Sequence, residues 1–111
     1  MVKNKLEHDI QNEIRIWCGE HDLLAIRINV GSGYTKDGRF FTTGAPNGYP
    51  DLTILGKNGK MCYCETKTPV GRLRPDQKQF HANLKERGFK VIVPHSLEEF
   101  IKEAEEWLNE K

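Results

Sequence analysis

The sequence lacks any apolar run near the ~20 residues that a membrane-spanning helix needs. Its first residues, Met1-Val-Lys-Asn-Lys5, also lack the apolar core of a secretory signal peptide. Cysteine is scarce: the chain has three, and two of them are separated by one residue in Cys62-Tyr-Cys64. An odd number of cysteines makes a poor disulfide framework and fits a reducing compartment. We therefore expect a cytoplasmic protein with free thiols and no membrane partner.

Charge of one sign is not in excess either, because 17 Lys and Arg balance 16 Asp and Glu to a formal net charge of +1. The distribution is uneven, however. Residues 57–90 hold nine basic and three acidic side chains (+6), and residues 91–111 hold two and six (−4). Such a segment can form a basic face that steers an anionic ligand, although solvated surface faces would explain the same pattern.

The length of 111 residues and a composition of 37% apolar and 30% charged residues indicate one globular domain over residues 1–111. Apolar residues spaced by four, four and three between Leu6 and Trp17 predict a helix that ends near Gly19. Asn58-Gly59 predicts a tight antiparallel hairpin. The other predicted elements are strands over 23–30, 50–55, 61–67 and 89–93, a helix between Pro75 and Gly88, and a helix after the Ser96–Glu99 capping box.

These elements follow the order α-β-β-β-α-β-α. Three meandering strands and a helical crossover to a fourth predict an α/β fold with a mixed four-stranded sheet flanked by helices. Residues 31–47 contain four Gly and one Pro, and this composition indicates a long loop or a loose hairpin. Loops of this length in a small domain often serve function.

Two acidic residues and a lysine are predicted to meet across the hairpin. Glu65 and Lys67 project from the same face of their strand, and Asp51 lies on the paired strand just after Pro50. Two carboxylates that converge in this way suit a hard cation such as Mg²⁺, which keeps waters that a phosphate can replace. A lysine beside such a site suits phosphodiester hydrolysis. The alternatives are an exposed ion pair for Glu65 and Lys67, and an ordinary Pro-Asp turn for Asp51.

At these residues the chain resembles the virus-type replication-repair nuclease (VRR-NUC) branch of the PD-(D/E)xK nuclease superfamily. Five motifs carry the resemblance, in order: a helical glutamate, Glu13; Arg27-Ile-Asn-Val-Gly31; Gly48-Tyr-Pro-Asp51; Glu65-Thr-Lys67; and Gly71-Arg-Leu-Arg-Pro-Asp-Gln77. Two departures are mild: Tyr49 replaces a smaller apolar residue, and Arg74 stands where a helix-capping Ser is common.

The resemblance implies a restriction-endonuclease-like core and a DNA endonuclease that depends on Mg²⁺ or Mn²⁺. Asp51 and Glu65 would bind the metal, together with the backbone carbonyl of Thr66, and Glu13 would complete the acidic cluster. Lys67 would activate or position water. Gln77 would hold Lys67 or the scissile phosphate, although its place also fits an ordinary polar residue in the first turn of a helix.

DNA contacts are expected from cations and aromatics around the predicted site, because cations bind phosphates and aromatic rings stack on bases. These residues are Arg27, Asn29, Tyr34, Lys36, Arg39, Arg72, Arg74 and Lys78. Many of them would equally serve solubility. A zinc site at Cys62 and Cys64 is disfavoured, because the usual spacing and a second ligand pair are missing; both are expected in the core, on the face opposite Glu65.

The sequence thus predicts a metal-dependent endonuclease for branched or otherwise structured DNA, with no small-molecule cofactor. Relatives that stand alone favour Holliday-junction resolution, which needs a two-fold symmetric homodimer for paired incisions. The alternatives are a flap nuclease, a less selective nuclease or nickase, and a non-catalytic DNA-binding module with the same fold. Size and family favour a bacterial or phage-infected host cell.

Overall fold

Four strands form the central sheet of the protein, and their order across it is β1-β4-β5-β6. The structure, a computed structural model, describes residues 6–28, 32–42 and 44–110. The strands are β1 (Leu24–Arg27), β4 (Leu52–Leu55), β5 (Met61–Cys64) and β6 (Lys90–Ile92). β4 pairs antiparallel with both β1 and β5, whereas β5 and β6 are parallel. The predicted mixed sheet is confirmed, and so is the helical crossover that a parallel pair requires.

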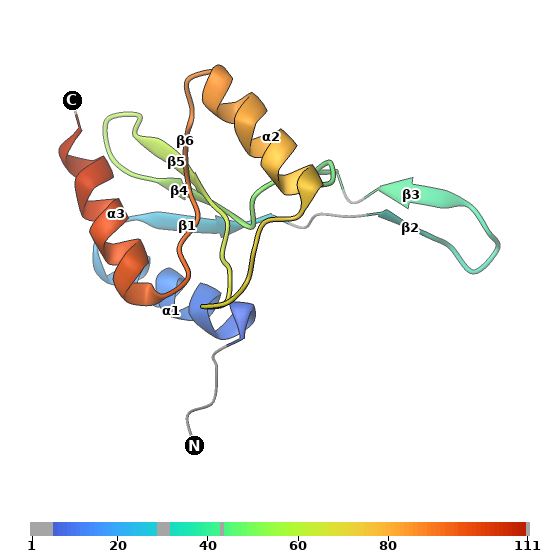
Figure 1. Ribbon diagram of the computed structural model, residues 1–111, viewed down its shortest axis with the longest axis horizontal. Coiled ribbons are helices and arrows are strands. Elements are labelled where there is room, and N and C mark those ends of the chain that lie inside the picture. Colours follow the sequence, from blue (N-terminus) through green and yellow to red (C-terminus); the bar gives the residue numbers. More distant parts are fainter. Residues whose placement is uncertain (1–5, 29–31, 43, 111) are drawn as a thin grey trace.

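Helices cover both faces of the sheet (Figure 1). α1 (Glu7–Glu20) and α3 (Leu97–Asn109) lie on one face, and α2 (Pro75–Glu86) lies on the other. Because successive strand residues face opposite sides, β5 and β6 contribute to two cores. The larger core joins the first face to α1 and α3; its buried residues include Ile10, Ile14, Leu52, Ile54, Cys62, Cys64, Ile92, Phe100 and Trp107.

A smaller core holds α2 against the opposite face. Its buried members are Tyr63, Leu84 and Val91, and the partly buried Tyr49 and Phe80 pack against them. The Tyr49 ring meets the Tyr63 ring edge-on at a centroid distance of 5.6 Å. This cluster is small, so α2 is held by fewer apolar contacts than α1 and α3.

The sharp turn between β4 and β5 sets the register of the two strands that carry the predicted site. Asn58 and Gly59 both have positive φ, at 60° and 77°, which is the conformation of a two-residue hairpin turn. The pairing aligns Leu55 with Met61 at the turn and Leu52 with Cys64 at the far end. If the same register is continued by one residue beyond Leu52 and Cys64, Asp51 lies opposite Glu65.

A hairpin is inserted between β1 and β4, so the loose hairpin expected within residues 31–47 is confirmed. It consists of β2 (Ser32–Tyr34) and β3 (Phe40–Thr42), and it projects away from the sheet (Figure 1). The aromatic rings of Tyr34 and Phe40 are exposed and pack edge-on against each other at 5.6 Å. Apart from this hairpin, the order of the elements is the predicted one.

The helix ends follow the sequence signals with one correction. Ser96 caps α3, since its Oγ accepts a hydrogen bond from the Glu99 N–H at 3.1 Å. The expected end of α1 at Gly19 is wrong, because the helix runs on to Glu20 and Asp22 takes the positive φ that follows it. Among the described residues, no helix is long and apolar enough to cross a bilayer.

The three cysteines are free and buried, in the positions expected of core residues. Burial raises the pKa of Cys18 to about 11 and that of Cys62 to about 12, and it also raises the pKa of Cys64. These thiols therefore stay protonated at neutral pH and are poor metal ligands.

Candidate active site at the end of the sheet

Asp51 and Glu65 meet where β4 begins and β5 ends. Asp51 precedes β4 directly, and its backbone carbonyl accepts a hydrogen bond from the Ile28 N–H at 3.0 Å, so β1 also reaches this end of the sheet. The Asp51 Oδ2 accepts a hydrogen bond from the Thr66 N–H at 3.0 Å. Side-chain hydrogen bonding also links the two carboxyl groups. The β4–β5 hairpin therefore brings Asp51 and Glu65 together, as the sequence predicted.

The pKa values of both carboxyl groups are raised because neither group is well solvated. Burial, and next the hydrogen bond and charge of Glu65, raise the pKa of Asp51 to about 7 from its ordinary value of 3.8. Burial likewise raises the pKa of Glu65, while the hydrogen bond from Asp51 and the charge of Lys67 partly oppose this. Near neutral pH the pair thus carries negative charge that the surrounding protein only partly compensates, and a cation would relieve it.

Lys67 lies on the same side of its segment as Glu65, and 4% of its surface is exposed. The chain continues beside β6 here, since the Glu65 N–H donates to the Ile92 carbonyl and the Lys67 N–H donates to the Pro94 carbonyl, at 2.9 and 3.1 Å. These two bonds keep residues 65–67 extended beside β6, so that the side chains of Glu65 and Lys67 both point towards α2. An ammonium group this buried beside two carboxyl groups is unlike the exposed ion pair that the sequence left open.

The buried face of α2 completes the site with two polar residues. Gln77, His81 and Leu84 are the buried residues of this helix. The Gln77 Oε1 accepts a hydrogen bond from the Arg74 N–H at 2.9 Å and so caps the helix that Arg74 itself cannot cap. Gln77 therefore has a structural role at the helix start. Its NH₂ group can donate to a phosphate, and the second lone pair of its Oε1 could accept from Lys67.

His81 is a site residue that the sequence analysis missed. Its Nε2 lies 3.2 Å from the Glu65 Oε1, with 3% of His81 and 1% of Glu65 exposed. Burial, together with the charges of Lys85 and Lys67, lowers the pKa of His81, so the ring is neutral at neutral pH. The signal for it was present, because a residue four positions after Gln77 shares its helical face.

The acidic residue of α1 whose charge reaches the site is Glu7. Its negative charge raises the pKa of Glu65, which places it near the carboxyl pair although it is exposed in the first turn of α1. Glu13 lies two turns further along and is half-buried. Its predicted role, like that of the Thr66 carbonyl, stays a prediction; Thr66 itself is fully buried.

Most predicted DNA contacts lie outside this buried centre. Arg27, Tyr34, Lys36, Arg39, Arg72, Arg74 and Lys78 are all exposed. Two of them are paired, since Arg39 lies 3.1 Å from Asp37 and Arg74 lies 3.2 Å from Asp76. Asn29 falls outside the described residues. The structure does not gather these cations in one place: Lys36 and Arg39 are on the projecting hairpin, and the others flank α2 and β1.

The carboxyl groups of Asp51 and Glu65 suit Mg²⁺ or Mn²⁺. They suit less well a metal ion that needs side chains for all of its ligands. No group of three or more His, Cys, Asp or Glu within residues 6–28, 32–42 and 44–110 could hold a metal ion unaided. Mg²⁺, however, is commonly bound by one or two carboxylates and retains several waters. Asp51 and Glu65 provide such a pair, and a cation between them would compensate the charge that burial disfavours.

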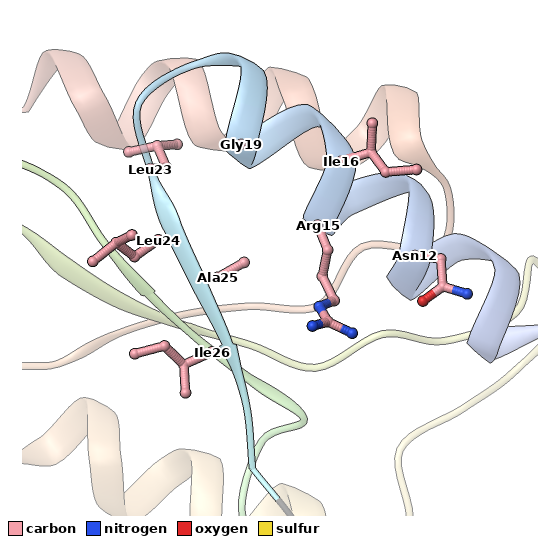
Figure 2. Close-up of a pocket in the computed structure, with 8 residues that line it drawn as sticks. All are labelled: Asn12, Arg15, Ile16, Gly19, Leu23, Leu24, Ala25 and Ile26. Atoms are coloured by element: carbon pink, nitrogen blue, oxygen red, sulfur yellow. The ribbon is translucent and has the colours of Figure 1, made fainter.

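A second surface feature is a pocket of about 610 Å³ between α1 and β1, separate from the carboxyl pair (Figure 2). It is lined by Asn12, Arg15, Ile16, Gly19 and Leu23–Ile26, and none of these is a predicted site residue. β1 is an edge strand, and Leu24 and Ile16 are 64% and 65% exposed beside it. Apolar side chains along an open sheet edge are typical of a surface that another protein covers.

Comparison with known proteins agrees with this architecture. The profile of the VRR-NUC domain family matches residues 7–98. A solved structure described as a VRR_NUC domain superimposes with a TM-score of 0.68 and 22% sequence identity, over 89% of this chain and 94% of the other. At this identity the likeness shows the fold alone. No curated protein matches the chain.

Proposed function

We propose that this chain, which belongs to the VRR-NUC family of nuclease-type domains, hydrolyses DNA phosphodiesters as a Mg²⁺- or Mn²⁺-dependent endonuclease. One observation carries the proposal. Asp51 and Glu65 lie together at the end of the sheet with their carboxyl groups largely removed from solvent, and the buried Lys67 lies on the same side as Glu65. A non-catalytic binding module would have no need of two acidic groups and an ammonium group desolvated together.

Each residue would have a distinct task. Asp51 and Glu65 would hold the metal, with the Thr66 carbonyl as a further ligand and Glu7 or Glu13 adding negative charge nearby. When bound, the metal supplies charge neutralisation and lowers the pKa of water. Lys67 would hold the attacking water and offset charge on the phosphoryl group. The NH₂ group of Gln77 would donate to the phosphate, and its Oε1 is the atom that could accept from Lys67.

The reaction is hydrolysis at phosphorus. The oxygen of water forms a bond to phosphorus, the bond to one bridging oxygen breaks, and the leaving oxygen takes up a proton. The water gives up one proton as it attacks and the leaving oxygen takes one up, so the protons balance. The Lys67 ammonium group would hold the water in place by donating a hydrogen bond to its oxygen. Burial strengthens this interaction, because an ammonium group acts over a longer range where water is excluded.

The substrate would be branched or otherwise structured DNA, with a four-way junction as the specific choice. The projecting hairpin offers Tyr34 for stacking and Lys36 and Arg39 for phosphates, and such contacts read shape and backbone rather than sequence. Two cuts related by the symmetry of a junction require two sites in a homodimer. We place the dimer contact at the exposed edge formed by Ile16 and Leu24.

A cleavage assay with matched variants tests the catalytic claim. Asp51→Ala and Lys67→Ala should each abolish cleavage of a labelled junction in Mg²⁺, while binding in Ca²⁺ persists. Asp22→Ala and Lys57→Ala serve as controls, because these residues form an exposed ion pair at 2.8 Å and Lys57 lies in the turn at the other end of the β4–β5 hairpin. Cleavage that survives both site variants, or that proceeds equally in EDTA, contradicts the proposal.

A substrate panel separates the remaining choices. Labelled four-way junction, flap, nicked duplex and intact duplex should be compared at equal concentration in the same Mn²⁺ buffer. Preferred, paired cutting of the junction supports a resolvase, whereas equal cutting of all substrates indicates a less selective nuclease. Binding without cleavage of any substrate indicates a DNA-binding module.

A further inference from the structure

One buried hydrogen bond near the carboxyl pair has no place in the chemistry above. The Nε2 of His81 lies 3.2 Å from the Oε1 of Glu65, and both side chains are almost wholly removed from solvent. A carboxylate oxygen can only accept, so Nε2 carries the proton and donates it. Solvent does not compete for this bond.

The backbone determines where the ring lies. His81 belongs to α2, a helix fixed to the sheet by the packing of Leu84 with Tyr63 and Val91. Along the helix, His81 comes three residues before Leu84; along the strand, Glu65 comes two residues after Tyr63. Three helical residues rise about 4.5 Å and a two-residue strand step about 6.6 Å, which are similar lengths. The docking of α2 through Phe80 and Leu84 together therefore brings His81 to the level of Glu65, and the loss of Leu84 alone leaves Phe80 in place.

The second ring nitrogen supports a purpose beyond packing. Nδ1 of His81 is buried, and no described residue gives it a hydrogen-bond partner. An unpaired buried acceptor is destabilising, and an apolar side chain of similar size would avoid it. The ring is thus held at this place by one bond alone, the bond to Glu65.

We propose that His81 is a positioning residue, which holds the Glu65 carboxylate so that its other oxygen is presented to a divalent cation shared with Asp51. A hydrogen bond to one carboxylate oxygen restricts the rotation of the group, and such partners commonly change metal affinity about 10–100-fold when removed. The inference rests on the proposed function, because it takes Glu65 as a metal ligand.

Mn²⁺ binding to the metal-free protein, measured by calorimetry without DNA, tests the inference. His81→Gln and His81→Asn are both polar and fit the site, but only the longer Gln side chain brings its NH₂ group to the place of Nε2. The expected result is an affinity within about threefold of wild type for His81→Gln and a loss of at least tenfold for His81→Asn and His81→Leu. Circular dichroism spectra establish that each variant is folded.

Leu84→Ala is the matched control for a general loosening of α2. It removes a buried side chain one turn away and should lower the melting temperature, yet it should leave Mn²⁺ affinity within about threefold. Cleavage gives a second readout: His81→Asn should need more Mn²⁺ for half-maximal rate, while the rate at saturating Mn²⁺ changes less.

The outcomes distinguish this inference from the proposed function. Equal Mn²⁺ affinity for wild type, His81→Gln, His81→Asn and His81→Leu overturns the role of His81 and leaves the metal site standing. Equal weakening by His81→Gln, His81→Asn and Leu84→Ala assigns a packing role only and also overturns it. A wild-type protein that binds no Mn²⁺ removes the proposed function and, with it, this inference.

Discussion

Replacing Asp51 by asparagine should stabilise the metal-free protein at pH 8. The pKa of Asp51 is about 7 in the folded protein, chiefly because of burial and then because of Glu65, against 3.8 ordinarily. Protonation of Asp51 therefore favours folding. This stabilisation is fully present below about pH 4 and is lost as the pH rises through about 7. At pH 8 the folded wild type must carry the ionised carboxylate beside Glu65, whereas the Asp51→Asn variant carries a neutral amide there.

The size of the effect follows from the pKa. The difference between about 7 and 3.8 corresponds to roughly 4 kcal/mol of free energy of unfolding at about 1.4 kcal/mol per pH unit. Asp51 is only half-buried, so solvent screening reduces this to on the order of 1–2 kcal/mol. The asparagine side chain keeps an oxygen that accepts from the Thr66 N–H. The melting temperature in EDTA should rise by about 3–8 °C.

Thermal unfolding followed by circular dichroism at pH 4 and pH 8 is the assay. The variant should gain stability at pH 8 and little at pH 4, where Asp51 is protonated in the folded protein. Excess Mn²⁺ should reverse the order, since a ligand at 100 times its Kd adds about 2.7 kcal/mol to wild type only. Asp76→Asn is the control, because the hydrogen bond from Arg74 lowers the pKa of Asp76 and its removal should not stabilise. A lower melting temperature for Asp51→Asn at pH 8 in EDTA would refute the reasoning.

Four further outcomes are expected. Gly48→Ala should destabilise by about 1–3 kcal/mol in chemical denaturation, because Gly48 has φ of 89° and a Cβ would lie 2.4 Å from the Asp76 carbonyl oxygen; an unchanged midpoint would contradict this. Arg72→Ala and Lys78→Ala should each reduce the slope of log binding constant against log salt by about 1 in fluorescence anisotropy, if each cation neutralises one phosphate. Leu24→Glu should convert a dimer to a monomer in sedimentation velocity, and a dimer that persists would exclude this edge as the interface. Backbone amides of α2 should exchange hydrogen before those of α1 and α3, and exchange at equal rates would show that the smaller core is no weaker.

The pairing of Asp51 with Glu65 could be predicted because every step of it is local. The turn signal at Asn58-Gly59 brings the two strands together antiparallel, and strand alternation then fixes which side chains share a face. The register differs by one residue from that of a two-residue loop, because the N–H that donates to the Lys60 carbonyl across the loop is that of Gly56 rather than that of Lys57. The mixed sheet followed equally from the order of elements, since a helix between two strands makes them parallel. Local rules of this kind need no knowledge of how separate elements pack.

The contributions of the helices were harder to predict because they depend on tertiary packing. Glu13 was predicted on α1 from the family resemblance, whereas Glu7, at the start of the same helix, was not predicted although its charge raises the pKa of Glu65. His81 was not predicted as a site residue. Its neighbour Glu65 is 16 residues earlier in the chain, and only the docking of α2 brings them together.

The docking of α2 joins the two halves of the site, and this explains why polar residues are tolerated on its buried face. Gly48 lies against the first turn of α2, three residues before Asp51, and Leu84 packs on Tyr63, two residues before Glu65. A shift of the helix would therefore move both carboxyl groups relative to each other. A larger apolar core under α2 would hold it more firmly, but it would occupy the face on which Glu65 and Lys67 lie. The limited core under α2 is thus a consequence of building a charged site between a helix and a sheet.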